Sequence, residues 1–151
     1  MIVESGKRLH VLLADDDADD HFIFNEAILQ TKLPLELSYA EDGQKLLEVL
    51  ENDVIPDVLF LDINMPNVNG IECLKAIRSK PRFKNLPIII YTTTDFKPNI
   101  DTCFEYGANL FVVKPNSFND LVKIIEKLCT IEWTTTVTTP TLDFFKYQIL
   151  G

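Results

Sequence analysis

The fold is decided by the stretch Val58-Leu59-Phe60-Leu61-Asp62-Ile63-Asn64-Met65-Pro66-Asn67-Val68-Asn69-Gly70. Its first four residues form a short apolar run, which is typical of a buried strand, and a carboxylate follows at Asp62. A charged side chain at the end of an apolar strand is costly to bury unless a cation, hydrogen bonds or covalent chemistry uses it. The same arrangement occurs earlier, where Val11-Leu12-Leu13-Ala14 precedes Asp15-Asp16-Asp17. Two strand ends are therefore predicted to carry the chemistry.

Short apolar runs alternate with segments of helical period along the chain. We expect strands at residues 9–14, 35–40, 58–61, 88–91 and 110–113, because these runs are largely apolar and rich in branched side chains. Between and after them, apolar residues recur on single helical faces: Leu46, Leu47 and Leu50; Ile71, Leu74 and Ile77; Leu121, Ile124, Ile125 and Leu128. Repeated βα units of this kind predict a doubly wound α/β domain with a five-stranded parallel sheet.

Particular residues indicate where the helices begin. Asp19 or Asp20 is expected to cap the first helix or to be a solvated charge at its start, and Ser117 is expected to cap the last helix. Pro98 suits a first helical turn. Gly70 is expected to allow a backbone turn that is closed to other residues.

Composition limits the classes of protein and ligand. The chain has 151 residues, of which 46% are apolar, enough for one domain with a core. A net charge of −9 and a pI near 4.6 argue against binding to nucleic acid or to anionic membranes, which are themselves polyanions. No apolar segment approaches the roughly 20 residues that span a bilayer. We therefore expect a soluble, cytoplasmic protein whose partners are proteins or cations.

The cysteine and histidine residues give no sign of a disulfide framework or a zinc site. Cys73, Cys103 and Cys129 are widely spaced and lack any Cys-x-x-Cys pair, so buried packing roles are expected. His10 is expected in a strand and His21 on a helix surface, without a ligand partner at zinc spacing.

Strand ends of a parallel sheet meet at one edge, which brings several reactive side chains together. Asp15, Asp16 and Asp62 follow two strands, the Thr92 hydroxyl ends a third, and the Lys114 ammonium ends a fourth. Crowded carboxylates repel one another unless a divalent cation compensates them, and oxygen ligands suit Mg²⁺ or Mn²⁺. The set fits an aspartyl phosphate, with Asp62 as nucleophile and Thr92 and Lys114 holding phosphoryl oxygens.

In their order along the chain, these residues resemble the receiver domains of two-component response regulators. The resemblance covers about residues 8–128. It rests on Asp15-Asp16, Leu61-Asp62-Ile63-Asn64-Met65-Pro66 with Gly70, Tyr91-Thr92, Gly107-Ala108 and Val113-Lys114-Pro115. It implies a flavodoxin-like receiver fold with strand order 2-1-3-4-5 and a receiver domain at residues 8–129.

The resemblance also implies the role of each acidic residue. Asp62 would be the phosphoacceptor, and its phosphoryl donor would be a histidine kinase or a histidine phosphotransfer protein. Mg²⁺, or Mn²⁺, would be bound directly by Asp16, Asp62 and the backbone carbonyl of Asn64, with Asp15 acting through water. Such a protein is not an ordinary enzyme, since its own reactions would be self-phosphorylation from small donors and autodephosphorylation.

A conformational switch is a further implication of the resemblance. Phosphorylation would draw the Thr92 hydroxyl inward and leave space for the aromatic residue of the last strand, here Phe111. The changed surface would then be read by a downstream protein that the sequence does not identify.

Residues 130–151 are far too few for an output domain, which usually needs at least ~50 residues. The chain is therefore expected to be a single-domain regulator. This tail has a large apolar content: Trp133, Leu142, Phe144, Phe145, Tyr147, Ile149 and Leu150. We expect it to be a dimerisation or docking segment, which would make the protein a homodimer in the first case.

Two alternatives from other classes are weighed against the receiver. A metal-dependent phosphatase of the haloacid dehalogenase type also uses a strand-end aspartate, but that superfamily generally has a second aspartate where this chain has Asn64. A constitutive interaction module that keeps the fold without phosphorylation would not need the complete set of site residues.

Overall fold

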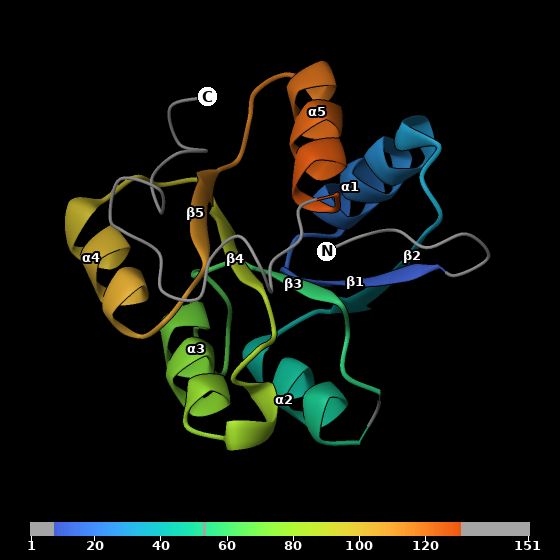
Figure 1. Ribbon diagram of the computed structural model, residues 1–151. Helices are drawn as coiled ribbons and strands as arrows, with labels where there is room; N and C mark the ends of the chain where they lie inside the picture. Colours follow the sequence, from blue (N-terminus) through green and yellow to red (C-terminus); the bar gives the residue numbers. More distant parts are fainter. Residues whose placement is uncertain (1–7, 53, 131–151) are drawn as a thin grey trace.

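The computed structural model describes residues 8–52 and 54–130. In this part of the chain five parallel strands form one sheet in the order β2-β1-β3-β4-β5 (Figure 1). The strands are β1 (Leu9–Ala14), β2 (Leu35–Ala40), β3 (Val58–Leu61), β4 (Ile88–Thr92) and β5 (Leu110–Val113). The helices are α1 (Ala18–Thr31), α2 (Gly43–Asn52), α3 (Gly70–Arg78), α4 (Lys97–Glu105) and α5 (Phe118–Leu128), with a short 3₁₀ helix, η1 (Pro81–Phe83), before β4.

Helices cover both faces of the sheet. α1 and α5 lie on one face, and α2, α3 and α4 lie on the other (Figure 1). Because side chains alternate along a strand, Ile89 and Tyr91 of β4 pack toward α1 and α5, whereas Ile90 and Phe111 pack toward α2, α3 and α4. The predicted doubly wound fold, its flavodoxin-like arrangement and its strand order are thus confirmed.

Four of the five predicted strands have the predicted bounds, and β4 continues one residue further, to Thr92. Two predicted helix starts are also confirmed. The Ser117 hydroxyl caps α5 by accepting from the Asp120 N–H at 3.3 Å, and Pro98 lies in the first turn of α4.

The predicted cap of α1 is wrong. Asp17 has the extended backbone of an N-cap, with φ −94° and ψ 115°, and its carboxylate accepts from the Asp19 N–H at 2.8 Å. Asp19 and Asp20 already belong to the first helical turn. They cannot act as the cap, because the capping residue must precede that turn.

The prediction that Gly70 occupies a position closed to other residues is confirmed. The φ of Gly70 does not lie in the left-handed region, and the constraint is one of space: a Cβ at Gly70 would lie 2.1 Å from the Asp62 carbonyl oxygen. The neighbouring loop has its left-handed residue at Asn67, with φ 68°, and Asn69 caps α3 by accepting from the Glu72 N–H. Gly70 therefore lets α3 begin in contact with the backbone of the strand-end aspartate.

At the amino ends of β4 and β5, Arg78 joins three segments of chain. Its guanidinium donates to the carbonyls of Gly107 at 2.9 Å and Phe83 at 2.7 Å and to Oδ1 of Asn109 at 2.9 Å. The same Asn109 oxygen also accepts from the Ile88 N–H at 2.8 Å. Burial lowers the pKa of Arg78 to about 10, so the group remains charged at neutral pH.

All three thiols are buried and free, which confirms their predicted packing role. Burial raises the pKa of Cys73 to about 11 and those of Cys103 and Cys129 to about 12. Among the described residues, no helix combines the length and apolar character needed to cross a membrane.

Candidate functional site

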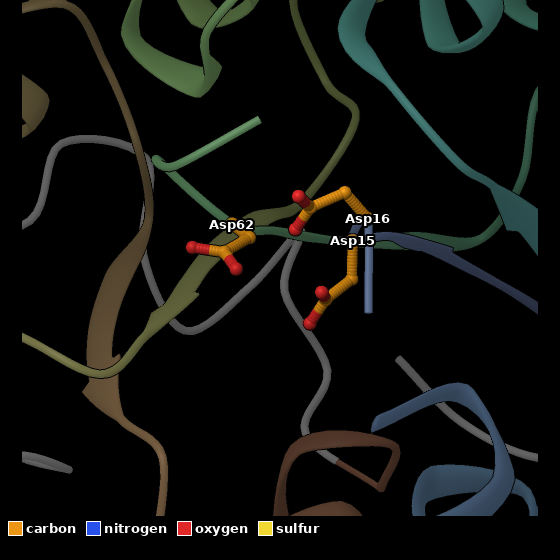
Figure 2. Close-up of side chains that lie close together, drawn as sticks. All are labelled: Asp15, Asp16 and Asp62. Carbon is orange, nitrogen blue, oxygen red and sulfur yellow. The ribbon is translucent and has the colours of Figure 1, made fainter. Parts of the chain in front are cut away.

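Three carboxylates lie together at the carboxyl edge of the sheet. Asp15 and Asp16 follow β1 and Asp62 follows β3, and one oxygen from each lies within 4.8 Å of the others (Figure 2). The Asp62 N–H donates to the Ala14 carbonyl at 2.9 Å, so the neighbouring strands β1 and β3 fix the two aspartate positions relative to each other. Asp15 and Asp62 are buried, whereas Asp16 is exposed. The group can therefore be reached from solvent on the Asp16 side.

Lys114 supplies the positive charge inside this group. Its ammonium donates to Asp15 at 2.8 Å, to Asp62 at 3.1 Å and to Asp20 at 2.7 Å. Its backbone N–H donates to the Thr92 carbonyl at 2.7 Å, which ties the residue after β5 to the end of β4. The expectation that Asp20 is only a solvated charge is therefore wrong, because its half-buried carboxylate has the shortest of the three contacts with Lys114.

The pKa values of Asp15 and Lys114 are shifted by burial and by the contact between the two side chains. Burial raises the pKa of Asp15, although the hydrogen bonds from Lys114 and from the Asp17 N–H oppose that shift. For Lys114, burial alone lowers the pKa, but the hydrogen bonds to Asp15 and Asp20 and the negative charges of Asp62 and Asp15 together outweigh it, and the net shift is upward. Lys114 therefore stays charged through the physiological pH range.

Thr92 is the last residue of β4, and Phe111 lies on β5 with its side chain in the cluster that packs toward α2, α3 and α4. The Thr92 side chain is fully buried, and its hydroxyl has no hydrogen-bond partner in the part of the chain that the structure describes. Phe111 is fully buried and stands opposite Ile90 in the β4–β5 register. A buried hydroxyl without a protein partner is unusual in a native protein, which makes this hydroxyl a candidate to bind a group from outside the chain.

The sequence prediction missed a contact between His21 and the backbone of Asp15. The His21 ring is half-buried, and Nε2 donates to the Asp15 carbonyl at 2.5 Å. The same ring stacks on Tyr39 of β2, with centroids 4.5 Å apart. It therefore fixes the backbone that carries the first carboxylate. The local sequence gave no signal for this contact, because a histidine on a helix surface already has an ordinary explanation.

A cavity of about 690 Å³ opens beside the exposed carboxylate. It lies against the start of α3 and the loop before it, and its lining includes Asp16, Asn64, Met65, Lys75 and Asn99. The Asn64 N–H donates to the Asp62 carboxylate at 3.2 Å, so this loop contacts the strand-end aspartate directly. The cavity gives small ligands room next to the carboxylates.

The arrangement brings together a nucleophile, cation ligands and groups that stabilise negative charge. An ionised carboxylate such as that of Asp62 is a nucleophile without a separate base. Three carboxylates contact the single ammonium, and the exposed Asp16 lies close to two of them, so carboxylates outnumber the one cation and the group fits a divalent cation with oxygen ligands.

Comparison with known proteins identifies the family. The model of the response regulator receiver domain matches residues 11–126. The response regulator Rcp1 of Synechocystis sp. is 27% identical over 143 residues, which cover 91% of this chain and 97% of that protein. The two-component response regulator ARR5 of Arabidopsis thaliana is 30% identical over 139 residues, which cover 85% of this chain and 74% of that protein.

A solved structure gives the same result. The Mn²⁺-bound form of Rcp1 matches with a TM-score of 0.73 at 27% identity, covering 88% of this chain and 99% of that one. Neither the family match nor these relatives support the phosphatase alternative. The chain therefore belongs to the response regulator receiver family, and its function is that of a phosphoacceptor domain in two-component signalling.

Proposed function

We propose that Asp62 accepts the phosphoryl group, with a histidine kinase or a histidine phosphotransfer protein as donor. The observation that carries this assignment is the contact between Lys114 and Asp62 at 3.1 Å, at a strand end that also holds two further carboxylates. An Asp62 oxygen attacks phosphorus, the bond between phosphorus and the donor nitrogen breaks, and the released imidazole takes a proton from solvent.

Lys114 and Thr92 receive the oxygens of the new phosphoryl group in this proposal. The ammonium already contacts the accepting carboxylate, so it can donate to a phosphoryl oxygen without a large movement. The Thr92 hydroxyl is buried and lacks a partner among the described residues, and a phosphoryl oxygen would supply one.

The metal site consists of Asp15, Asp16, Asp62 and the backbone carbonyl of Asn64. Its side-chain donors are carboxylate oxygens within 4.8 Å of one another, and such hard oxygen ligands fit Mg²⁺, with Mn²⁺ as a close substitute. The bound ion supplies positive charge that offsets the excess of carboxylates and the charge of the donor phosphate.

Thr92 and Phe111 form the switch in this proposal. Movement of the Thr92 hydroxyl toward the phosphoryl group opens space on the side of the sheet where Phe111 packs against residues of α3 and α4. The surface of α4 and β5 then changes, and a downstream protein binds the changed surface.

Phosphorylation with a small donor tests the assignment of Asp62. Wild type, Asp62→Asn and Asp101→Asn are incubated with Mg²⁺ and acetyl phosphate, and the intact mass of each is followed. Wild type and Asp101→Asn are expected to gain one phosphoryl group, because Asp101 lies in an exposed ion pair on α4. Asp62→Asn is expected to gain none. An unmodified wild type, or an equally modified Asp62→Asn, would contradict the assignment.

We also propose that residues 8–129 form the receiver domain and that residues 130–151 form a dimerisation or docking segment. Residues from 131 onward lie outside the described part of the chain, so the proposal rests on their apolar sequence. Light scattering of the full chain and of a chain ending at residue 131 tests the dimer version. A dimeric full chain together with a monomeric shortened chain supports the proposal. A full chain and a shortened chain that are both monomeric would rule it out.

A further inference from the structure

The ammonium of Lys114 is saturated with acceptors. It has three N–H donors, and three carboxylates accept from it: Asp20 at 2.7 Å, Asp15 at 2.8 Å and Asp62 at 3.1 Å. A phosphoryl oxygen can therefore bind the ammonium only by replacing one of them. The longest contact is the one to Asp62, the residue that carries the new group. Asp15 and Asp20 are the partners that remain.

The two remaining partners come from opposite ends of one short segment. Asp15 directly follows β1, and Asp20 is the third residue of α1. The other oxygen of Asp15 accepts from the Asp17 N–H at 2.9 Å, and Asp17 in turn caps the helix that carries Asp20. The position of each carboxylate relative to Lys114 is therefore set by the backbone of residues 15–20.

Asp20 differs from the other two partners in its surroundings. The side chain of Asp15 is fully buried and that of Asp62 is 8% exposed, whereas that of Asp20 is 30% exposed. Without Asp20, one ammonium donor would be free, and the flexible lysine stem would let the ammonium pair more closely with the two buried carboxylates. A closer pair with Asp62 would occupy the oxygen lone pairs that must attack phosphorus.

We propose that Asp20 is a positioning residue for phosphorylation, which holds the Lys114 ammonium beside Asp62 without letting it pair fully with the nucleophile. This inference rests on the proposed role of Asp62. Asp20 acts through Lys114 and does not itself touch the phosphoryl group. It also links α1 to the residue that follows β5, so the helix next to the site contributes to the geometry of the reaction.

The rate of phosphorylation by acetyl phosphate in the presence of Mg²⁺ tests the inference in the full chain. Asp19→Ala is the matched control, because Asp19 lies in the same helical turn, is exposed, and its loss removes the same charge. Asp20→Ala is expected to react about tenfold more slowly than Asp19→Ala, which corresponds to about 1.4 kcal/mol in the barrier. Asp20→Asn keeps an acceptor oxygen for Lys114 and is expected to recover most of the rate.

Thermal unfolding of each variant is measured beside its rate, so that a loss of folded protein is not read as a loss of positioning. Equal rates for Asp20→Ala and Asp19→Ala would overturn the inference. It would also be overturned if Asp20→Asn reacted as slowly as Asp20→Ala. Both results leave the proposed function intact as long as wild type reacts and Asp62→Asn does not. If wild type is as unreactive as Asp62→Asn, the proposed function itself fails.

Discussion

The polar groups at the two edges of the sheet are arranged in opposite ways. At the amino edge, Arg78 makes three hydrogen bonds to neutral oxygens, and Asn109 accepts from two donors. At the carboxyl edge, three carboxylates contact one ammonium and a fourth, Asp16, lies close to two of them, while the Thr92 hydroxyl has no partner among the described residues. Polar groups whose hydrogen bonds are all satisfied within the protein stabilise the fold. Unbalanced charge and a hydroxyl without a partner can instead bind a ligand. The difference separates a structural network from a reactive one.

Removal of the Arg78 guanidinium should have the largest effect on the free energy of unfolding. Arg78→Met removes three hydrogen bonds and leaves the Gly107 carbonyl without its donor, and we expect it to lower the free energy of unfolding by about 3 kcal/mol. Urea unfolding measures the change. Arg82→Met is the control, because Arg82 is exposed and its guanidinium lies over the Phe83 ring, at 4.8 Å, so its loss should cost about 1 kcal/mol or less. Similar losses for the two variants would remove the distinction between the edges.

A divalent cation should stabilise the carboxyl edge. Mg²⁺ at a hundred times its dissociation constant is expected to stabilise the folded protein by about 2.7 kcal/mol, because it binds the folded state alone. In a protein of this size such a gain raises the unfolding temperature by roughly 5–10 °C. Differential scanning fluorimetry measures the shift. Asp16→Asn should reduce it, and Arg78→Met should retain it. An undiminished shift in Asp16→Asn would place the ion elsewhere.

The smallest expected effect concerns the hydroxyl without a partner. Thr92→Val should leave the free energy of unfolding within about 0.5 kcal/mol of wild type, or raise it, because no hydrogen bond is lost. Ser117→Ala removes a hydroxyl that caps α5 and should cost about 1 kcal/mol. Chemical unfolding of both variants compares a free hydroxyl with a bonded one. A larger loss in Thr92→Val than in Ser117→Ala would mean that Thr92 is already satisfied.

The sequence predicted the strands well because each is a short apolar run with polar residues around it. The β4 strand was predicted one residue short. Thr92 is a polar residue after an apolar run, which suggests the start of a loop, although the residue is fully buried in the strand. The cap of α1 was misplaced because three consecutive acids and two later ones offer several similar choices, and only the backbone angles of Asp17 distinguish them.

Contacts between distant residues were the main limit of sequence-based prediction at the site. Asp15, Asp16 and Asp62 were predicted to lie together because parallel strands end at one edge, and the structure brings them together. The contact between Asp20 and Lys114 joins residues 94 positions apart and has no local signal, because an acid in a first helical turn already has an ordinary explanation.

The burial of the three thiols has a practical consequence for testing the proposed switch in solution. With a pKa near 11, Cys73 is a thiolate in roughly one molecule in ten thousand at neutral pH, and the other two thiols are still less ionised. Maleimide dyes react with thiolates, so a cysteine introduced at the exposed Glu105 of α4 would be labelled almost alone. The native protein therefore serves, without removal of its own cysteines, as a scaffold for a fluorescent reporter of phosphorylation.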